Sequence, residues 1–200
     1  MKTRRELIFG LLVAVMLLTT VGTVFSVVSD PPHWELRYSG ATWSNEQSHN
    51  GQFSVKLMVD APAVYGSVRY TPSGYLTLSD IRTISVWLYR DEGLLTVDDY
   101  FRVTVKTPSG SIISLYGSPV YSTVVFPEDS WTYLASTDVL WYDSVGEVNG
   151  GTWSDVQAAY GSMQVTVVGW VAGGAGSDRT YFIDQLNVGT AQLNEPIGRR

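Results

Sequence analysis

The sequence predicts an all-β domain in which two antiparallel sheets pack face to face. Short runs of β-branched and aromatic residues recur between residues 33 and 190, separated by Gly, Pro, Ser, Asn and Asp, which is the pattern of a sandwich or barrel. Residues 101–107 alternate between apolar and polar side chains, and residues 53–59 do so except at Met58. Helical periodicity is nearly absent. Each run is therefore expected to be a strand with one buried face.

About ten strands are expected, a number that suits two packed sheets. In chain order they cover residues 34–38, 53–59, 65–70, 83–89, 101–107, 111–116, 120–125, 131–136, 163–171 and 180–188. The sequence Pro-Ser-Gly at Pro72 and at Pro108 predicts turns, and the second joins two strands as a hairpin. The glycine-rich residues 173–178 predict another hairpin turn. One short helix is expected, capped by Ser154 with Gln157 and ended by Gly161.

The first 29 residues predict export. Lys2, Arg4 and Arg5 precede an uncharged run, of which residues 7–28 would form a helix of about 33 Å, enough to cross a hydrocarbon core of about 30 Å. The positive flank keeps the amino end in the cytoplasm and sends the remainder across the membrane. Residues 1–29 are therefore a signal peptide or an N-terminal membrane anchor, residues 30–190 the sandwich and residues 191–200 a C-terminal tail. The expected location is secreted or cell surface, with residues 7–28 in the membrane if they are not cleaved.

Charge and composition exclude several functions. The chain has a formal net charge of −6, which opposes a nucleic-acid partner. The same charge disfavours polyanionic glycans and anionic lipid, although a local basic groove is compatible with it. With no cysteine and two histidines, the chain lacks the usual ligands of zinc, haem and iron–sulfur sites. A strand-rich chain with no G-x-S-x-G elbow also disfavours a serine hydrolase.

Aromatic residues are the candidate ligand-binding groups, because the chain has seven Trp and twelve Tyr. An aromatic ring binds sugar by stacking on the C–H face of a pyranose, while nearby polar groups bond the hydroxyls. In residues 83–89, Trp87 and Tyr89 point to the face opposite the apolar residues, so they are predicted to form a platform on the concave sheet. A loop at residues 141–153 offers Trp141 and Tyr142 as a second set. The alternative for each ring is a place in the core or rim of the sandwich.

Two stretches carry a resemblance to a known family: TWSNEQSHNGQFSVKL near the start of the domain, and TYFIDQLNVG as its last strand. Together they look like a carbohydrate-binding-module jelly roll, within the wider group of galactose-binding-like sandwiches. The resemblance covers residues 34–189 and implies a two-sheet jelly-roll sandwich. A concanavalin A-like sandwich is the alternative fold, since similar strings occur there.

The resemblance also implies one structural Ca²⁺. Many relatives bind it with an early glutamate, a carbonyl beside a turn glycine and an aspartate of the last strand, which match Glu35, the carbonyl of Gln52 and Asp184. Such an ion would join distant strands of a chain that has no disulfides. The first strand departs from the family's pattern, which makes Glu46 a substitute for Glu35. The alternative is that Asp184 sits at a sheet rim and accepts a hydrogen bond from a backbone amide or from water.

Three functions follow, in order. The leading one is an exported, non-catalytic module that binds carbohydrate through an aromatic platform. The second is a structural or adhesive cell-envelope protein that binds protein partners. The third is a glycosidase or polysaccharide lyase, which would need a pair of facing carboxylates in a cleft. The expected partner is a glycan or another cell-envelope component, and not a nucleic acid.

Overall fold

The computed structural model describes residues 33–60, 65–173, 178–189 and 191–192. The predictions for residues 1–29 and for the last eight residues of the tail lie outside this part of the chain. Among the described residues, no helix has the length and apolar character needed to cross a membrane.

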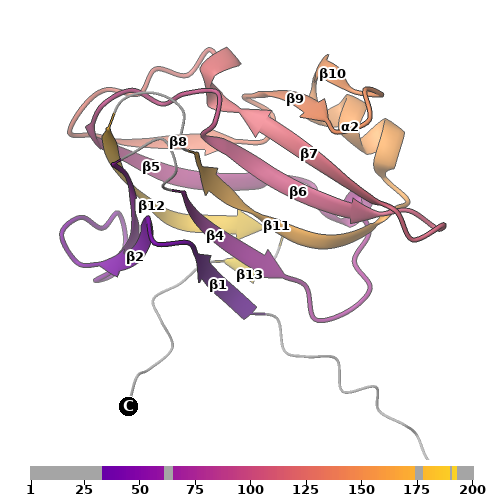
Figure 1. The fold of residues 1–200 in the computed structure, drawn as a ribbon, viewed down its shortest axis with the longest axis horizontal. Helices are drawn as coiled ribbons and strands as arrows, with labels where there is room; N and C mark the ends of the chain where they lie inside the picture. The colour runs from indigo at the N-terminus through magenta and orange to yellow at the C-terminus, as the bar shows by residue number, and fades with distance from the viewer. Residues whose placement is uncertain (1–32, 61–64, 174–177, 190, 193–200) are drawn as a thin grey trace, which may run out of the picture.

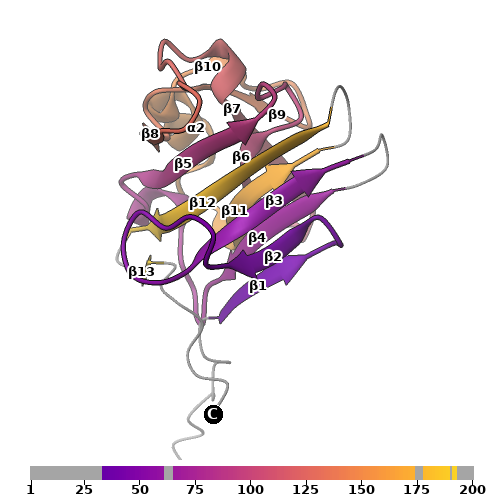
Figure 2. The same ribbon diagram turned by 90° about the vertical axis from the view of Figure 1, so that its left-hand side faces the viewer.

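The described residues form two antiparallel sheets, which confirms the predicted two-sheet jelly-roll sandwich. Figure 1 looks onto the larger sheet, with the smaller sheet behind it, and Figure 2 shows the two layers from the side. In spatial order the larger sheet consists of β1 (His33–Arg37), β4 (Gly66–Thr71), β11 (Gln164–Ala172), β6 (Tyr100–Lys106), β7 (Ile112–Ser118), β9 (Leu140–Asp143) and β10 (Asn149–Gly151). The smaller sheet consists of β2 (Ala41–Ser44), β3 (Ser54–Val59), β12 (Arg179–Val188), β5 (Ile84–Glu92) and β8 (Trp131–Ala135), and β13 (Ala191–Gln192) pairs with β12.

The hydrophobic core lies between the two sheets. The alternation seen in the sequence decides which side chains enter it: Val55 and Leu57 of β3 and Val103 and Val105 of β6 are fully or almost fully buried. The side chains between them on each strand point to the outer faces of the sandwich. The fold therefore leaves one outer face on each sheet for contacts with other molecules.

The helix forms where the sequence predicts it, but its cap differs. Helix α2 (Trp153–Tyr160) begins after Thr152, whose side chain accepts from the backbone N–H of Asp155 while the Asp155 carboxylate accepts from Thr152. This capping box has the same three-residue spacing as the predicted pair of Ser154 and Gln157, two residues earlier in the chain. Ser154 lies inside the helix instead.

Three parts of the chain differ from the prediction. Residues 120–125 do not form the predicted strand: the 3₁₀-helix η2 (Pro119–Tyr121) covers their start, and Val125 is 77% exposed. Strands β2, β9, β10 and β13 were not predicted, because they are too short to show a period in the sequence. Strands β11 and β12 pair with strands of different sheets, so the predicted hairpin turn between them is wrong and the connection crosses from one sheet to the other. The hairpin of β6 and β7 around Gly110 is confirmed.

Candidate functional site

Trp87 and Tyr89 lie together on the outer face of the smaller sheet. Trp87 stands opposite Tyr133 of β8, and Tyr89 stands opposite Trp131 of the same strand. On the other side of β5, Tyr89 pairs with Phe182 of β12. The alternation of β5 therefore places the two predicted residues on one face, as the sequence indicated, and adds aromatic neighbours from two further strands.

The rings of this cluster pack on each other and on His49. The His49 imidazole stacks on Trp87 with ring centroids 3.8 Å apart and planes 15° apart, and it meets Trp131 edge-on at 5.6 Å. Trp87 also contacts Tyr133 at 5.4 Å, and Tyr89 contacts Trp131 at 5.5 Å. A histidine therefore covers one face of the tryptophan on which a sugar would stack.

Asp184 holds the His49 turn in place over the cluster. Its Oδ2 accepts from the backbone N–H groups of His49 and Asn50, both at 2.9 Å, and its Oδ1 accepts from Gln185 at 2.7 Å. The side chain is only 5% exposed. These contacts match the alternative prediction for Asp184, in which its carboxylate accepts hydrogen bonds from backbone amides.

These contacts do not fit the predicted calcium ligands. Backbone N–H groups point at the Asp184 carboxylate, whereas Ca²⁺ needs oxygen ligands around it. Glu35 lies on β1 of the other sheet and forms an ion pair with Arg37 at 2.8 Å. Glu46 pairs with Lys56 at 2.7 Å. In the part of the chain that the structure describes, no three His, Cys, Asp or Glu side chains gather as a metal site, so Ca²⁺ stays a prediction of the resemblance.

The second predicted pair is divided between the core and the surface. Trp141 is fully buried and donates its indole N–H to the Ser136 carbonyl at 2.8 Å, so its prediction as a ligand-binding residue is wrong. Residues 141–153, which were predicted as a loop, include most of the β9–β10 hairpin. Side chains alternate along β9, so Trp141 points inward and Tyr142 outward. Tyr142 joins the outer face of the larger sheet.

That outer face carries a row of side chains that crosses all seven strands. Backbone pairing aligns one residue from each strand, and most of them are tyrosine, arginine or other polar residues. The row consists of Glu35, Arg69, Gly169, Arg102, Tyr116, Tyr142 and Asn149. We call this row, with the tyrosines beside it, the arginine–tyrosine face.

Tyrosines line the arginine–tyrosine face along its length. Tyr100 meets Tyr116 edge-on at 5.2 Å, and Tyr142 contacts Tyr121 at 5.8 Å. At the β1 end, Tyr38 and Tyr65 lie 6.3 Å apart and are 57% and 45% exposed. Burial raises the pKa of the Tyr100 hydroxyl above its ordinary value of 10.0, so this group stays a neutral donor and acceptor across the physiological pH range.

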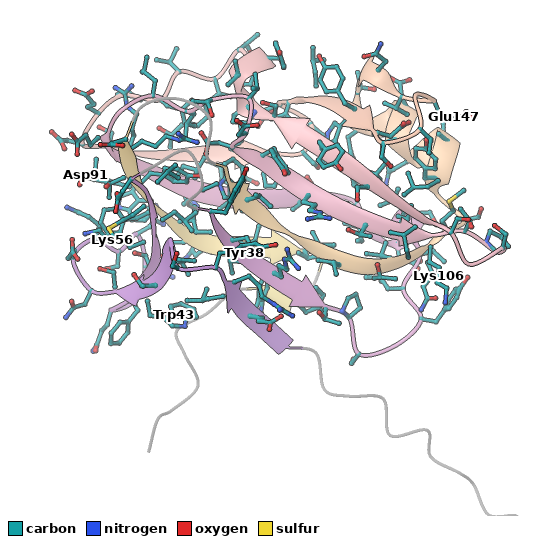
Figure 3. The ribbon with its side chains drawn as sticks, viewed as in Figure 1. Tyr38, Trp43, Lys56, Asp91, Lys106 and Glu147 are labelled. Atoms are coloured by element: carbon teal, nitrogen blue, oxygen red, sulfur yellow. The ribbon has the colours of Figure 1, made fainter. Side chains whose placement is uncertain are left out.

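Two arginines stand in the middle of this face. Arg69 and Arg102 both pair with Gly169, where a side chain would collide with the backbone of β4 at Val68 and Arg69. Arg69 donates to the Tyr38 hydroxyl at 3.2 Å and lies over its ring. The Nε atoms of both arginines are buried without an acceptor. Figure 3 looks onto the same face and labels Tyr38, just after β1, and Lys106, at the end of β6.

Sequence reasoning missed most of this face, although one signal for it was present. The alternation of residues 101–107 already placed Arg102 and Lys106 on the polar side of their strand. The sequence did not reveal that β4, β11, β6, β7 and β9 are neighbours, so tyrosines and arginines from distant segments could not be assigned to one face.

Comparisons with known proteins find structural matches alone. No protein-family model matches the chain, and no curated protein sequence does. Among solved structures, the chain is similar to the family 30 carbohydrate-binding module of a Clostridium thermocellum cellulosomal cellulase, with 14% identity, a TM-score of 0.44, and coverage of 78% of this chain and 88% of that one. A family 11 module from the same organism gives 13% identity, a TM-score of 0.42, and coverage of 77% and 84%.

Two further matches lie within longer chains. A carbohydrate-binding module of the β-sandwich superfamily matches with 10% identity and a TM-score of 0.41, where the match covers 80% of this chain and 57% of that one. An exo-β-agarase matches with 13% identity and a TM-score of 0.42, covering 86% of this chain and 24% of the agarase.

Proposed function

We propose that this protein binds a carbohydrate chain on the arginine–tyrosine face and does not cleave it. The observation that carries the proposal is the alignment of tyrosines and arginines from neighbouring strands on one open sheet face. Rings of this kind offer surfaces for pyranose C–H groups, and guanidinium and hydroxyl groups bond the sugar hydroxyls. The long row suits an extended ligand better than a small compact one.

The smaller sheet is the weaker candidate for the same function. His49 stacks on Trp87 and meets Trp131 edge-on, so the imidazole contacts both tryptophans of this cluster. A sugar would have to displace the imidazole, whose backbone is held by Asp184. Trp87 and Tyr89 thus serve mainly to pack the outer side of this sheet.

The lack of catalysis is part of the proposal and rests on the carboxylates. Glycoside hydrolysis uses two carboxyl groups on either side of the scissile bond. At the outward positions of the described strands of the larger sheet, the sole carboxylate is Glu35, and it is paired with Arg37. This arrangement supports binding over hydrolysis.

A second function, adhesion to a protein partner, has an observation of its own. Exposed apolar side chains gather at one end of the sandwich, where Leu94 and Val120 line a cavity of about 260 Å³ and are 66% and 43% exposed. Val125 nearby is 77% exposed. Apolar patches of this kind favour protein contacts. Export to the cell surface, with residues 7–28 as leader or anchor, is compatible with either function and is proposed with both.

Affinity electrophoresis of the full chain in gels that contain soluble polysaccharides tests the proposal. Tyr116→Ala and Tyr38→Ala should each weaken polysaccharide binding about fivefold, seen as less retardation in the gel, because losing one stacked ring costs about 1 kcal/mol. Tyr133→Ala is the matched control, since Tyr133 is 45% exposed on the opposite sheet. If Tyr133→Ala or Trp87→Ala loses binding while Tyr116→Ala and Tyr38→Ala bind normally, the site lies on the smaller sheet. A folded protein that binds no polysaccharide would overturn the proposal.

A further inference from the structure

We propose that the ligand of the arginine–tyrosine face is an anionic glycan chain, whose carboxylate or sulfate groups are bound by Arg102 and Arg69. This inference rests on the proposed function and names the chemical class of its ligand. The chain as a whole has a formal net charge of −6, which by itself would disfavour an anionic ligand. The evidence lies in where the charges stand and in which of them lack partners.

The outward positions of the larger sheet are locally basic. Four cationic side chains and one anionic one occupy them among the described strands, giving a formal charge of +3. They are Arg37, Arg69, Arg102 and Lys106 on the basic side and Glu35 on the acidic side. The negative charge of the chain as a whole is therefore carried elsewhere, and an anionic polymer would meet a favourable local field on this face.

Arg102 is the main candidate on this face for binding an anionic group. Within the described residues it makes no ion pair or hydrogen bond, and its Nε is buried without an acceptor. In the described part of the chain the Nη groups of its guanidinium have no protein acceptor either, so a carboxylate or sulfate that supplies one binds there favourably. Around it stand Tyr116 on one side and Gly169 on the other, and Tyr100 is close in sequence. One acidic residue, Asp98, acts electrostatically on Tyr100 beside it.

Arg69 repeats the arrangement two strands away. Both arginines pair with Gly169, so two strand spacings separate their backbones, about 10 Å. Arg69 contacts the Tyr38 hydroxyl and ring, which fixes its side chain without neutralising its charge. Glu35 stands opposite Arg69 but pairs with Arg37. Two planar guanidinium groups at this spacing suit carboxylates or sulfates repeated along a chain, since each can accept two parallel hydrogen bonds.

The test uses the full chain and two pairs of polymers, each pair sharing a backbone and differing in charge: polygalacturonate with its methyl ester, and dextran sulfate with dextran. The full chain should bind at least one anionic polymer more than tenfold tighter than its uncharged partner, because charge-assisted hydrogen bonds contribute about 1.5–3 kcal/mol. This preference should weaken as NaCl is raised from 20 to 500 mM. The pair that shows the preference distinguishes carboxylate from sulfate.

Arg102→Gln should weaken binding to the anionic polymer by a much larger factor than binding to its uncharged partner, whereas Tyr116→Ala should weaken both by a similar factor. Lys56→Gln is the charge-matched control, because Lys56 lies on the other sheet and pairs with Glu46. Equal loss in Lys56→Gln and Arg102→Gln would show nonspecific attraction and overturn the inference. Equal binding of charged and uncharged polymers would overturn it while keeping the proposed function. A folded chain that binds none of the four would overturn both.

Discussion

The two outer faces of this sandwich use aromatic residues in different ways. On the smaller sheet, Trp87 and its neighbours pack against each other, and a turn held by Asp184 lays His49 on top of them. On the larger sheet, the tyrosines stand beside Arg69 and Arg102, which have no carboxylate partner among the described residues. An abundance of aromatic residues therefore does not locate a binding face. What distinguishes the two is whether the polar groups between the rings are already satisfied.

The turns beside the two faces make the same contrast. Each turn is held by one aspartate, whose carboxylate accepts hydrogen bonds from several backbone N–H groups. Asp184 pins residues 49–50 across the smaller sheet and so covers its rings. Asp143 pins residues 145–148 at the edge of the larger sheet, next to Tyr142, and leaves that face open. The same kind of hydrogen bonding therefore covers the rings of the smaller sheet and leaves the outer face of the larger sheet exposed.

The largest expected effect comes from Asp184→Ala. This change leaves three backbone N–H groups without their acceptor, so it should destabilise the protein by about 3 kcal/mol. Urea unfolding measures the change. Asp91→Ala is the control, because Asp91 is exposed at the end of β5 on the same sheet. The variant should also uncover Trp87; if stability falls by less than about 0.5 kcal/mol, the turn is not what closes this face.

A smaller effect is expected for Asp143→Ala. Burial alone would raise the pKa of Asp143, but hydrogen bonds from the Tyr160 hydroxyl and from the amides of Val148, Gly146 and Val145 hold it below its ordinary value of 3.8. A carboxyl with a lowered pKa stabilises the folded state above its unfolded pKa, about 3.9, and loses that contribution as the pH falls through the folded value. The variant should lose about 1–2 kcal/mol at pH 7.

Urea unfolding from pH 7 to pH 2.5 checks the assignment. The difference between Asp143→Ala and the wild type should be constant above about pH 5 and shrink below pH 4. Asp155→Asn, in the α2 capping box, serves for comparison because it removes a charge near the same edge. A difference that does not depend on pH would mean that packing, and not the carboxylate, holds the turn beside Tyr142.

The smallest effect is expected from calcium. Because Asp184 is already engaged by backbone N–H groups, 2 mM CaCl₂ against EDTA should shift the melting temperature by less than about 1 °C. Differential scanning calorimetry of the full chain measures this. A rise of several degrees that disappears in Asp184→Ala would establish the calcium site and show that the turn rearranges around an ion.

Local patterns predicted the strands well where they were long and one face was buried. The alternation of residues 53–59 and 101–107 gave β3 and β6, and the turn around Pro108 gave a hairpin. Residues 120–125 are rich in β-branched and aromatic residues but do not alternate, and they form no strand, because composition favours a strand only where a sheet edge can pair with it. Trp141 shows the same limit for sites, since nothing local distinguishes a ring that faces the core from one that faces solvent.

The sequence by itself determined that this is a two-sheet β-sandwich with the polar and apolar sides of its longer strands assigned, because side-chain direction along a strand depends only on its two-residue period. It also determined that Trp87 and Tyr89 share a face. Only the tertiary structure decided which strands are neighbours, and hence that Arg69, Gly169 and Arg102 form one row and that His49 covers Trp87. Those contacts join residues far apart in the chain, and strand order across two sheets follows from the packing of the whole core rather than from any local pattern.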